Sequence, residues 1–386
     1  MVIDILEECL DRLDKRMTWT EIAKMAGLTI SAISHIRNES IEPSFPVVLN
    51  LAKLTVKLSK RNNYIDVFSD LCLKFQRPQN IKCAFEFLAS HGKLYHLEKL
   101  IDSVKKEYSS RPNHYLNDWA EVYSILLLYK RNPKDFSFVH RLRTYSPKQL
   151  ETKVLSVLLE IYYLHTQKEY SLMLALSESV EQSLSKIKCS YIRSSFSYRL
   201  FQVLAHTYLY RFDEPEKARY YAEKIICDNF SADLAVDSYY IMGMSFFFED
   251  CEKCLTYLNK YVELLEEQGR YVLADSIKKN DIPFVQAHWG CPQSSEESVS
   301  PSEKAHYEAK WGDKEIALQL INECLASEGS SPFKLYYKAL ATGDESLFLE
   351  SLILFHKKMN KFYAKLPYEY VKTHPSLGQA AKQLIE

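Results

Sequence analysis

Short motifs repeated at near-constant spacing constrain the fold of this chain more than any other feature of its sequence. Lys217 and Lys253 each lie in a Glu-Lys-small unit, 36 residues apart. Gly312 and Gly343 each precede an aspartate, are 31 residues apart, and are both followed by an apolar segment. A period of about 34 residues is typical of units of two helices that bury their apolar faces against the next unit.

The composition favours an almost entirely helical chain. Only 9 of the 386 residues are glycine, far below the usual share of about 7%. Breaks at Pro78, Gly92, Pro112 and Pro147 separate amphipathic stretches of about 12–20 residues, as in stacked helix pairs. The sequence therefore predicts an all-α fold. We expect an N-terminal helix-turn-helix domain, a right-handed tetratricopeptide-like helical solenoid and a C-terminal capping or dimerisation helix.

The segment 19–38 has the pattern of a helix-turn-helix. Ile22 and the small Ala23 share a face of the first helix, and Gly27 permits the tight turn. An ordinary helical hairpin explains the apolar spacing, but not a polar outward face in the same register. The second helix of such a motif enters the major groove and presents its N-terminal residues to base edges. The candidate DNA-binding residues are those at its start and on its outward face: Thr29, Ile30, Ser31, Ser34, His35, Arg37 and Asn38.

Local charge agrees with DNA contact at this motif. The whole chain has a net charge of −1, which argues against general binding of polyanions. Between Lys15 and Arg61, eight basic residues face three acidic ones, 8 − 3 = +5. We expect this segment to face the phosphates of double-stranded DNA.

Composition also marks the segment boundaries. Residues 290–303 contain almost no apolar side chains and are typical of a loop, whereas the last residues carry an apolar stripe. The predicted segments are a DNA-binding domain (1–62), a first block of repeats (63–289), a linker loop (290–303), a second block (304–374) and a C-terminal capping or dimerisation helix (375–386).

No sequence pattern points to an enzyme. Phosphate-binding loops, nucleophile elbows and His-Glu-x-x-His motifs do not occur in the sequence. Cys251 and Cys254 have the spacing of a metal-binding pair, but Cys254 stands where the preceding repeat has Ala218, so we expect a packing role and no metal or cofactor. With nine scattered cysteines, no apolar run of about 18 residues and no signal peptide, we expect reduced thiols and a cytoplasmic protein that does not contact a membrane.

Three segments resemble the arbitrium receptor family of Bacillus phages: residues 191–196, 246–250 and 360–367. The similarity extends along most of the chain and is weakest in the first 60 residues and in residues 290–303. The resemblance implies a homodimeric transcription factor that binds an operator and activates a gene favouring lysis. It also implies that a phage-encoded hexapeptide ending in Arg-Gly-Ala switches this activity off.

The resemblance also implies peptide-binding positions: Lys82, His206, Tyr210, Asp233, Glu303, Asn360 and Phe362. Several depart from the family pattern, in which His206 and Tyr210 are asparagines, Asp233 is basic and Asn360 is an aspartate. A carboxylate is the natural partner of a peptide arginine because the guanidinium presents a fixed fork of donors. Glu303 is the first candidate for this role, and Asp233 is the second.

Two alternatives remain open at this stage. The chain is compatible with a host chromosomal regulator that responds to a quorum-sensing peptide. It is also compatible with a solenoid scaffold that binds proteins and carries a vestigial helix-turn-helix. Sequence-specific DNA binding separates both regulators from the scaffold.

Overall fold

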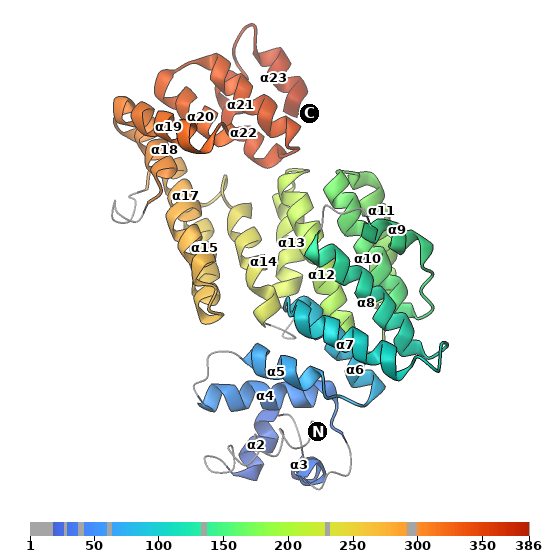
Figure 1. Ribbon diagram of the computed structural model, residues 1–386. Coiled ribbons are helices and arrows are strands. Elements are labelled where there is room, and N and C mark those ends of the chain that lie inside the picture. Colours follow the sequence, from blue (N-terminus) through green and yellow to red (C-terminus); the bar gives the residue numbers. More distant parts are fainter. Residues whose placement is uncertain are drawn as a thin grey trace. The chain divides into compact units, whose positions relative to one another are not determined.

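The computed structural model describes residues 18–26, 29–37, 42–59, 64–132, 137–227, 232–291 and 299–385. Every regular element in these ranges is a helix, which confirms the predicted all-α class (Figure 1). The chain forms two compact units, Met1–Leu200 and Phe201–Glu386. Their boundary falls inside one helix, α12, at a point where the sequence predicted no division.

The helices follow one another with short connections, and the four predicted breaks coincide with helix boundaries. Unit 1 contains α2 (Trp19–Ala26), α3 (Ile30–Arg37), α4 (Phe45–Ser59), α5 (Tyr64–Cys72), α6 (Pro78–Ser90), α7 (Leu94–Glu107), α8 (Tyr115–Arg131), α9 (Ser137–Thr144), α10 (Leu150–Gln167), α11 (Tyr170–Leu184) and the start of α12 (Ser190–Tyr210). Unit 2 contains the end of α12, α13 (Pro215–Ile226), α14 (Ala232–Ser245), α15 (Cys251–Glu267), α16 (Tyr271–Ser276), the π-helical η1 (Ile277–Asp281), α17 (Ile282–Trp289), α18 (Pro301–Trp311), α19 (Lys314–Glu328), α20 (Pro332–Thr342), α21 (Glu345–Lys357), α22 (Lys361–Val371) and α23 (Gly378–Ile385).

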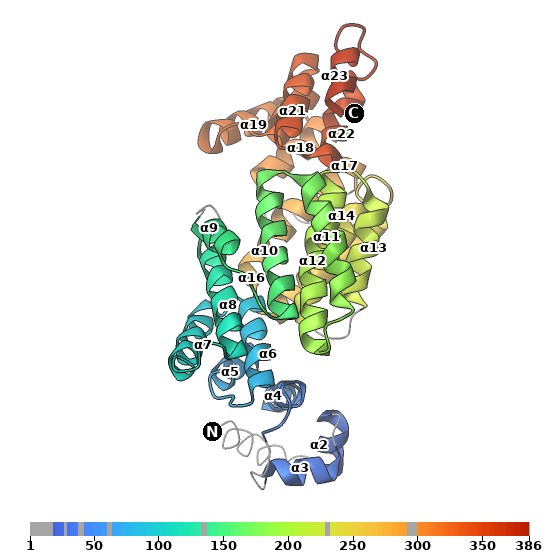
Figure 2. The same cartoon turned by 90° about the vertical axis from the view of Figure 1, so that its right-hand side faces the viewer.

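Helix α2 begins with a capping box that the sequence analysis missed. The backbone N–H and the hydroxyl of Thr18 both donate to the carboxylate of Glu21 at 2.8 Å, and the Glu21 N–H lies 3.4 Å from the Thr18 hydroxyl. These bonds satisfy amides that have no partner within the helix. Helix α2 packs against both α3 and α4, and Figure 2 shows α2 beside α3.

A buried ion pair joins α6 to α12 within unit 1. The Arg199 Nε donates to Glu86 Oε1 at 2.7 Å, and both side chains are almost fully buried. Ser195 and Tyr123 also donate to the Glu86 carboxylate, at 2.5 and 2.6 Å. A charge pair removed from water needs such additional hydrogen bonds to offset its desolvation, so this network fixes the two helices in one register.

Unit 2 is a helical solenoid-like array in which consecutive helices pack in pairs. In Figure 1, α20, α21 and α22 lie side by side. Gly243 on α14 approaches α15 so closely that an added Cβ would lie 3.1 Å from the Cys254 carbonyl oxygen. Ala218 and Cys254, which occupy matching repeat positions, are both fully buried. Small residues therefore permit the close helix crossings that the repeat pattern requires.

The C-terminal helix α23 packs on α21 and α22. Ala381 is fully buried, Leu384 and Ile385 pack against the core of unit 2, and the His356 ring lies 2.8 Å from the Leu384 carbonyl oxygen. The apolar stripe of this helix thus covers the end of its own array. Its predicted role in dimerisation stays a prediction.

Candidate functional sites

The first candidate site is the outward face of α3. Ile22, Ala23 and Ile33 are buried where α2 and α3 meet. Thr29 immediately precedes α3, and its carbonyl accepts the Ile33 N–H at 3.2 Å. The helix therefore begins where the sequence predicted.

Of the candidate DNA-contacting residues, some have exposed side chains, and the side chains of the others lie outside the part of the chain that the structure describes. Ile30 is 54% exposed, and Thr29, Ser31 and Ser34 are exposed as well. His35 and Arg37 lie on α3, but their side chains are outside the described part of the structure, as is all of Asn38. Hydroxyl groups are able to donate to and accept from base edges, and contact of these exposed side chains with DNA stays a prediction.

The second candidate site is a cavity of about 300 Å³ within unit 2. Two carboxyl groups, Asp281 at the end of η1 and Glu303 in the first turn of α18, line it. The remaining wall combines three tyrosines, two phenylalanines and small polar side chains: Tyr240, Tyr337, Tyr363, Phe284, Phe333, Asn280, Ser302 and Ser331. Of these described residues, none is a lysine or an arginine.

A proline explains how the two carboxyl groups come together. Pro283 has no N–H, so it cannot donate to the Lys279 carbonyl one turn earlier. The Lys279 carbonyl oxygen instead accepts a hydrogen bond from the Ser300 N–H, at 3.0 Å. Ser300 is also the N-cap of α18, with its hydroxyl 3.4 Å from the Glu303 N–H. The helix begins at Pro301, so Glu303 lies in its first turn and not in the predicted loop 290–303.

Tyrosine hydroxyls hold both carboxyl groups. The Tyr240 hydroxyl donates to Asp281 Oδ1 at 2.7 Å, and the Tyr337 hydroxyl lies 3.0 and 3.1 Å from the two oxygens of Glu303. In a capping box the Glu303 carboxylate would accept the Ser300 N–H. Because that N–H donates to Lys279, the Glu303 carboxyl group faces Tyr337 and the cavity.

Burial makes both carboxyl groups resist ionisation. It raises the pKa of Glu303 to about 8, although the hydrogen bond from Tyr337 opposes the shift. It raises the pKa of Asp281 to about 6, with the hydrogen bond from Tyr240 opposing and the nearby Glu303 adding to the shift. His306 lies 3.4 Å from Glu303, but burial and the charge of Lys310 hold its pKa well below the usual value. His306 is therefore neutral and does not compensate the carboxylates.

Of the other predicted peptide contacts, Tyr210, Asn360 and Phe362 each contact Tyr363, which lines the cavity, but none of the three is itself a lining residue. Tyr210 hydrogen-bonds Tyr240 and Tyr363. Asn360 caps α22 by accepting the Tyr363 N–H at 3.0 Å, and Phe362 is 1% exposed, with its ring 5.1 Å from that of Tyr363. Phe362 thus packs in the core.

The remaining three predicted contacts have different settings. His206 is exposed, with its ring 4.7 Å from that of Tyr210. Asp233 lies on α14, and its side chain is outside the description. Lys82 belongs to unit 1, where its ammonium lies 4.0 Å from Glu151 and over the rings of Tyr115 and Trp119.

Sequence reasoning missed Asp281 and the tyrosines that surround it. An isolated aspartate before the apolar run Ile282–Val285 was a usable signal, because such a residue at a helix irregularity is a frequent functional feature.

Among the described residues, none of the helices has the length and apolar character that a membrane span requires. The same ranges contain no group of three metal-binding side chains, and Cys251 faces Cys291 at 3.4 Å.

The chain is similar to known proteins in both sequence and fold. The model of a family described as AimR transcriptional regulator-like matches residues 65–373. An uncharacterized Bacillus anthracis protein is 26% identical over 229 residues, which cover 57% of this chain and 84% of that protein.

Two solved structures share the fold. A selenomethionine structure of phAimR matches with a TM-score of 0.81 at 18% identity, covering 100% of both chains. A structure of phAimR with a ligand matches with a TM-score of 0.60 at 18% identity, covering 83% of this chain and 96% of the other.

Proposed function

Because this chain belongs to the AimR transcriptional regulator-like family, as its resemblance predicted, we propose that it is a peptide-controlled, DNA-binding regulator of the lysis–lysogeny decision of a phage. A homodimer in the host cytoplasm binds its operator and activates transcription. A hexapeptide ending in Arg-Gly-Ala switches it off. The observation that carries the peptide part of this proposal is the cavity between Asp281 and Glu303.

The chemistry of the cavity fits a guanidinium group. Two carboxylates offer acceptors to its fixed fork of N–H donors, and the aromatic side chains of Phe284 and Phe333 also line the cavity, where a planar cation interacts favourably with aromatic rings. A buried carboxylate without a cation is destabilising. An arginine side chain that entered the cavity would favour the ionised form of both carboxyl groups. The affinity for the peptide therefore depends on the positive charge of its arginine.

The DNA part of the proposal rests on α3. Its exposed Ser31 and Ser34 face outward from a buried seam, and the predicted segment around them has a net positive charge. Operators read by such motifs contain two half-sites, so a dimer presents two copies of α3 at a fixed spacing.

Calorimetric titration of the full-length protein with two hexapeptides tests the peptide site. One ends in Arg-Gly-Ala, and the other replaces arginine with citrulline, which keeps the shape and removes the charge. We expect Glu303→Gln to weaken binding of the arginine peptide by about 30- to several-thousand-fold, since breaking a buried charge pair costs about 2–5 kcal/mol.

The matched control is Glu350→Gln, which removes an exposed carboxylate from α21 in the same unit. This variant should bind the arginine peptide like the wild type. Equal affinity of the wild-type protein for the arginine and citrulline peptides would contradict the proposed arginine pocket.

A further inference from the structure

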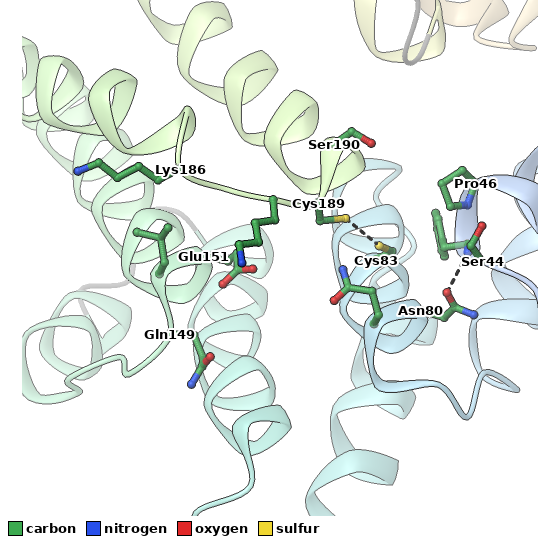
Figure 3. A pocket seen from close by; sticks show the side chains of 13 residues that line it. Ser44, Pro46, Asn80, Cys83, Gln149, Glu151, Lys186, Cys189 and Ser190 are labelled. Atoms are coloured by element: carbon green, nitrogen blue, oxygen red, sulfur yellow. Dashed lines mark hydrogen bonds between the residues drawn. The ribbon is translucent and has the colours of Figure 1, made fainter.

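Two cysteines distant in sequence meet in unit 1. Cys83 lies on α6 and is 1% exposed, whereas Cys189 immediately precedes α12 and is half-buried. Their sulfur atoms are 3.7 Å apart, with the Cys189 sulfur directed at Cys83 in Figure 3. A disulfide requires an S–S distance of about 2.05 Å, so the two sulfurs need to approach by about 1.7 Å.

The surroundings distinguish the two thiols. Cys189 shares a hydrogen bond with Cys83 and accepts hydrogen bonds from the backbone N–H groups of Ile192 and Tyr191 at the start of α12 and from Gln79. Led by the bond with Cys83, these contacts lower the pKa of Cys189 to about 6, against the effect of burial. The same bond and burial raise the pKa of Cys83. Near neutral pH, a Cys189 thiolate therefore faces a Cys83 thiol.

A small reagent can reach the pair from a cavity of about 650 Å³. Both cysteines line it, together with the start of α4 at Ser44–Pro46 and the start of α10 at Gln149–Glu151. Its charged lining residues are Glu151, Lys186 and Lys188. Figure 3 shows Lys186 and Glu151 on the side of the cavity away from Cys83.

We propose that Cys189 and Cys83 form an oxidation site that reacts with hydroperoxides to give a disulfide. The Cys189 sulfur attacks the peroxide O–O bond, forming a sulfenic acid, and the leaving oxygen takes up a proton as an alcohol or as water. The Cys83 sulfur then attacks the Cys189 sulfur. The S–S bond forms, the S–O bond breaks, and the hydroxide leaves as water with the Cys83 proton. The two sulfurs lose two electrons and the peroxide gains them.

Unit 2 supplies an internal comparison. The sulfurs of Cys251 and Cys291 are closer, at 3.4 Å, and both residues are half-buried. Burial and the hydrogen bond with Cys291 raise the pKa of Cys251 to about 12. Both pairs are close enough to react. Only thiolates attack peroxides efficiently, so the raised pKa of Cys251 disfavours attack by that sulfur, whereas Cys189 lines a cavity that a small peroxide can enter.

The test treats the reduced full-length protein with one equivalent of hydrogen peroxide at pH 7 and maps the products by mass spectrometry after digestion without reductant. We expect a Cys83–Cys189 cross-linked peptide pair to form several-fold faster than a Cys251–Cys291 pair. Cys83→Ser should stop the reaction at a Cys189 sulfenic acid, which dimedone traps. Cys251→Ser should leave the Cys83–Cys189 cross-link unchanged.

A second test needs no variant protein: the pH dependence of iodoacetamide labelling of the wild-type protein reports the pKa of Cys189. Labelling of Cys189 should follow a titration with a midpoint near pH 6 in the folded protein and near pH 8.5 in guanidinium chloride. A folded-state midpoint at pH 8 or above would overturn the proposal, as would faster oxidation of the Cys251–Cys291 pair.

Discussion

The chemistry of unit 2 depends on two carboxyl groups that burial makes difficult to ionise. The pKa values of about 8 for Glu303 and about 6 for Asp281 mean that Glu303 mostly holds a proton at pH 7, whereas Asp281 mostly does not. A bound guanidinium stabilises the ionised forms and lowers both pKa values. The proposed binding of an arginine peptide is therefore linked to the release of protons.

This linkage gives the peptide affinity a defined pH dependence. Below pH 8 a proton must leave Glu303 before the ion pair forms, so the affinity should rise as the pH increases from about 6 to about 8 and level off above 8. Calorimetry in phosphate and in Tris buffer, which differ in ionisation enthalpy, measures the released protons. Glu303→Gln should remove most of the dependence between pH 6 and 8 and leave only the smaller change near pH 6 that Asp281 contributes. An affinity that is constant across this range in the wild type would show that Glu303 does not pair with the peptide.

In α3, the helix that we propose contacts DNA, single residues are expected to have separable effects. Ser34→Ala and His35→Ala should each weaken operator binding by about 1–3 kcal/mol and change nonspecific binding little, because base-edge contacts supply specificity. Arg37→Ala should instead flatten the dependence of binding on salt, since it removes a phosphate contact. Fluorescence anisotropy at several salt concentrations separates the two effects. Unchanged operator affinity in all three variants would refute the proposed placement.

The sequence predicted one of the two cavity carboxylates, and the reason is physical. Glu303 followed from the resemblance and from the need of a guanidinium for a carboxylate. Asp281 lies 22 residues earlier, 303 − 281, and tertiary contacts of α18 with η1 and α17, among them the Ser300–Lys279 hydrogen bond, bring the two segments together. No local periodicity encodes these contacts. Phe362, whose assignment as a peptide contact stays a prediction, is buried among aromatic rings of the core.

At the scale of helices, local signals located most element boundaries. Pro78 begins α6, Gly92 separates α6 from α7, and Pro112 and Pro147 lie between helices, because proline lacks a donor N–H and glycine adopts conformations that helices exclude. The start of α18 was placed too late. Its signals, Ser300 as N-cap and Pro301 in the first turn, were present in the sequence but were obscured by the polar composition around them.

The C-terminal helix provides a test at the same scale. We expect truncation after Pro375, which removes α23, to reduce dimerisation and operator affinity together, because two half-sites require two linked motifs. Sedimentation velocity and DNA anisotropy measure the two effects. Since α23 also covers Ala381 and its neighbours in unit 2, circular dichroism must first establish that the truncated protein folds. A folded, truncated protein that sediments as an intact dimer would show that the dimer contact lies elsewhere.

For the whole molecule, the helix-turn-helix and the acidic cavity belong to different units. Helix α12 crosses the boundary between them in sequence, from Ser190 to Tyr210, and Tyr210 hydrogen-bonds two tyrosines of the cavity wall. Regulation requires a coupling free energy between the two sites, and this coupling is reciprocal: a peptide that weakens DNA binding is itself bound more weakly when DNA is present.

The most direct test of peptide-controlled DNA binding is to measure operator affinity with and without peptide. Selection from a pool of random duplexes identifies the operator, and fluorescence anisotropy then gives its dissociation constant for the full-length protein. We predict sequence-specific binding that a saturating Arg-Gly-Ala hexapeptide weakens by about 5- to 150-fold, the usual range of allosteric coupling. The citrulline peptide should have little effect. Absence of any preferred sequence would favour the scaffold alternative, and operator affinity that the bound arginine peptide leaves unchanged would contradict peptide control.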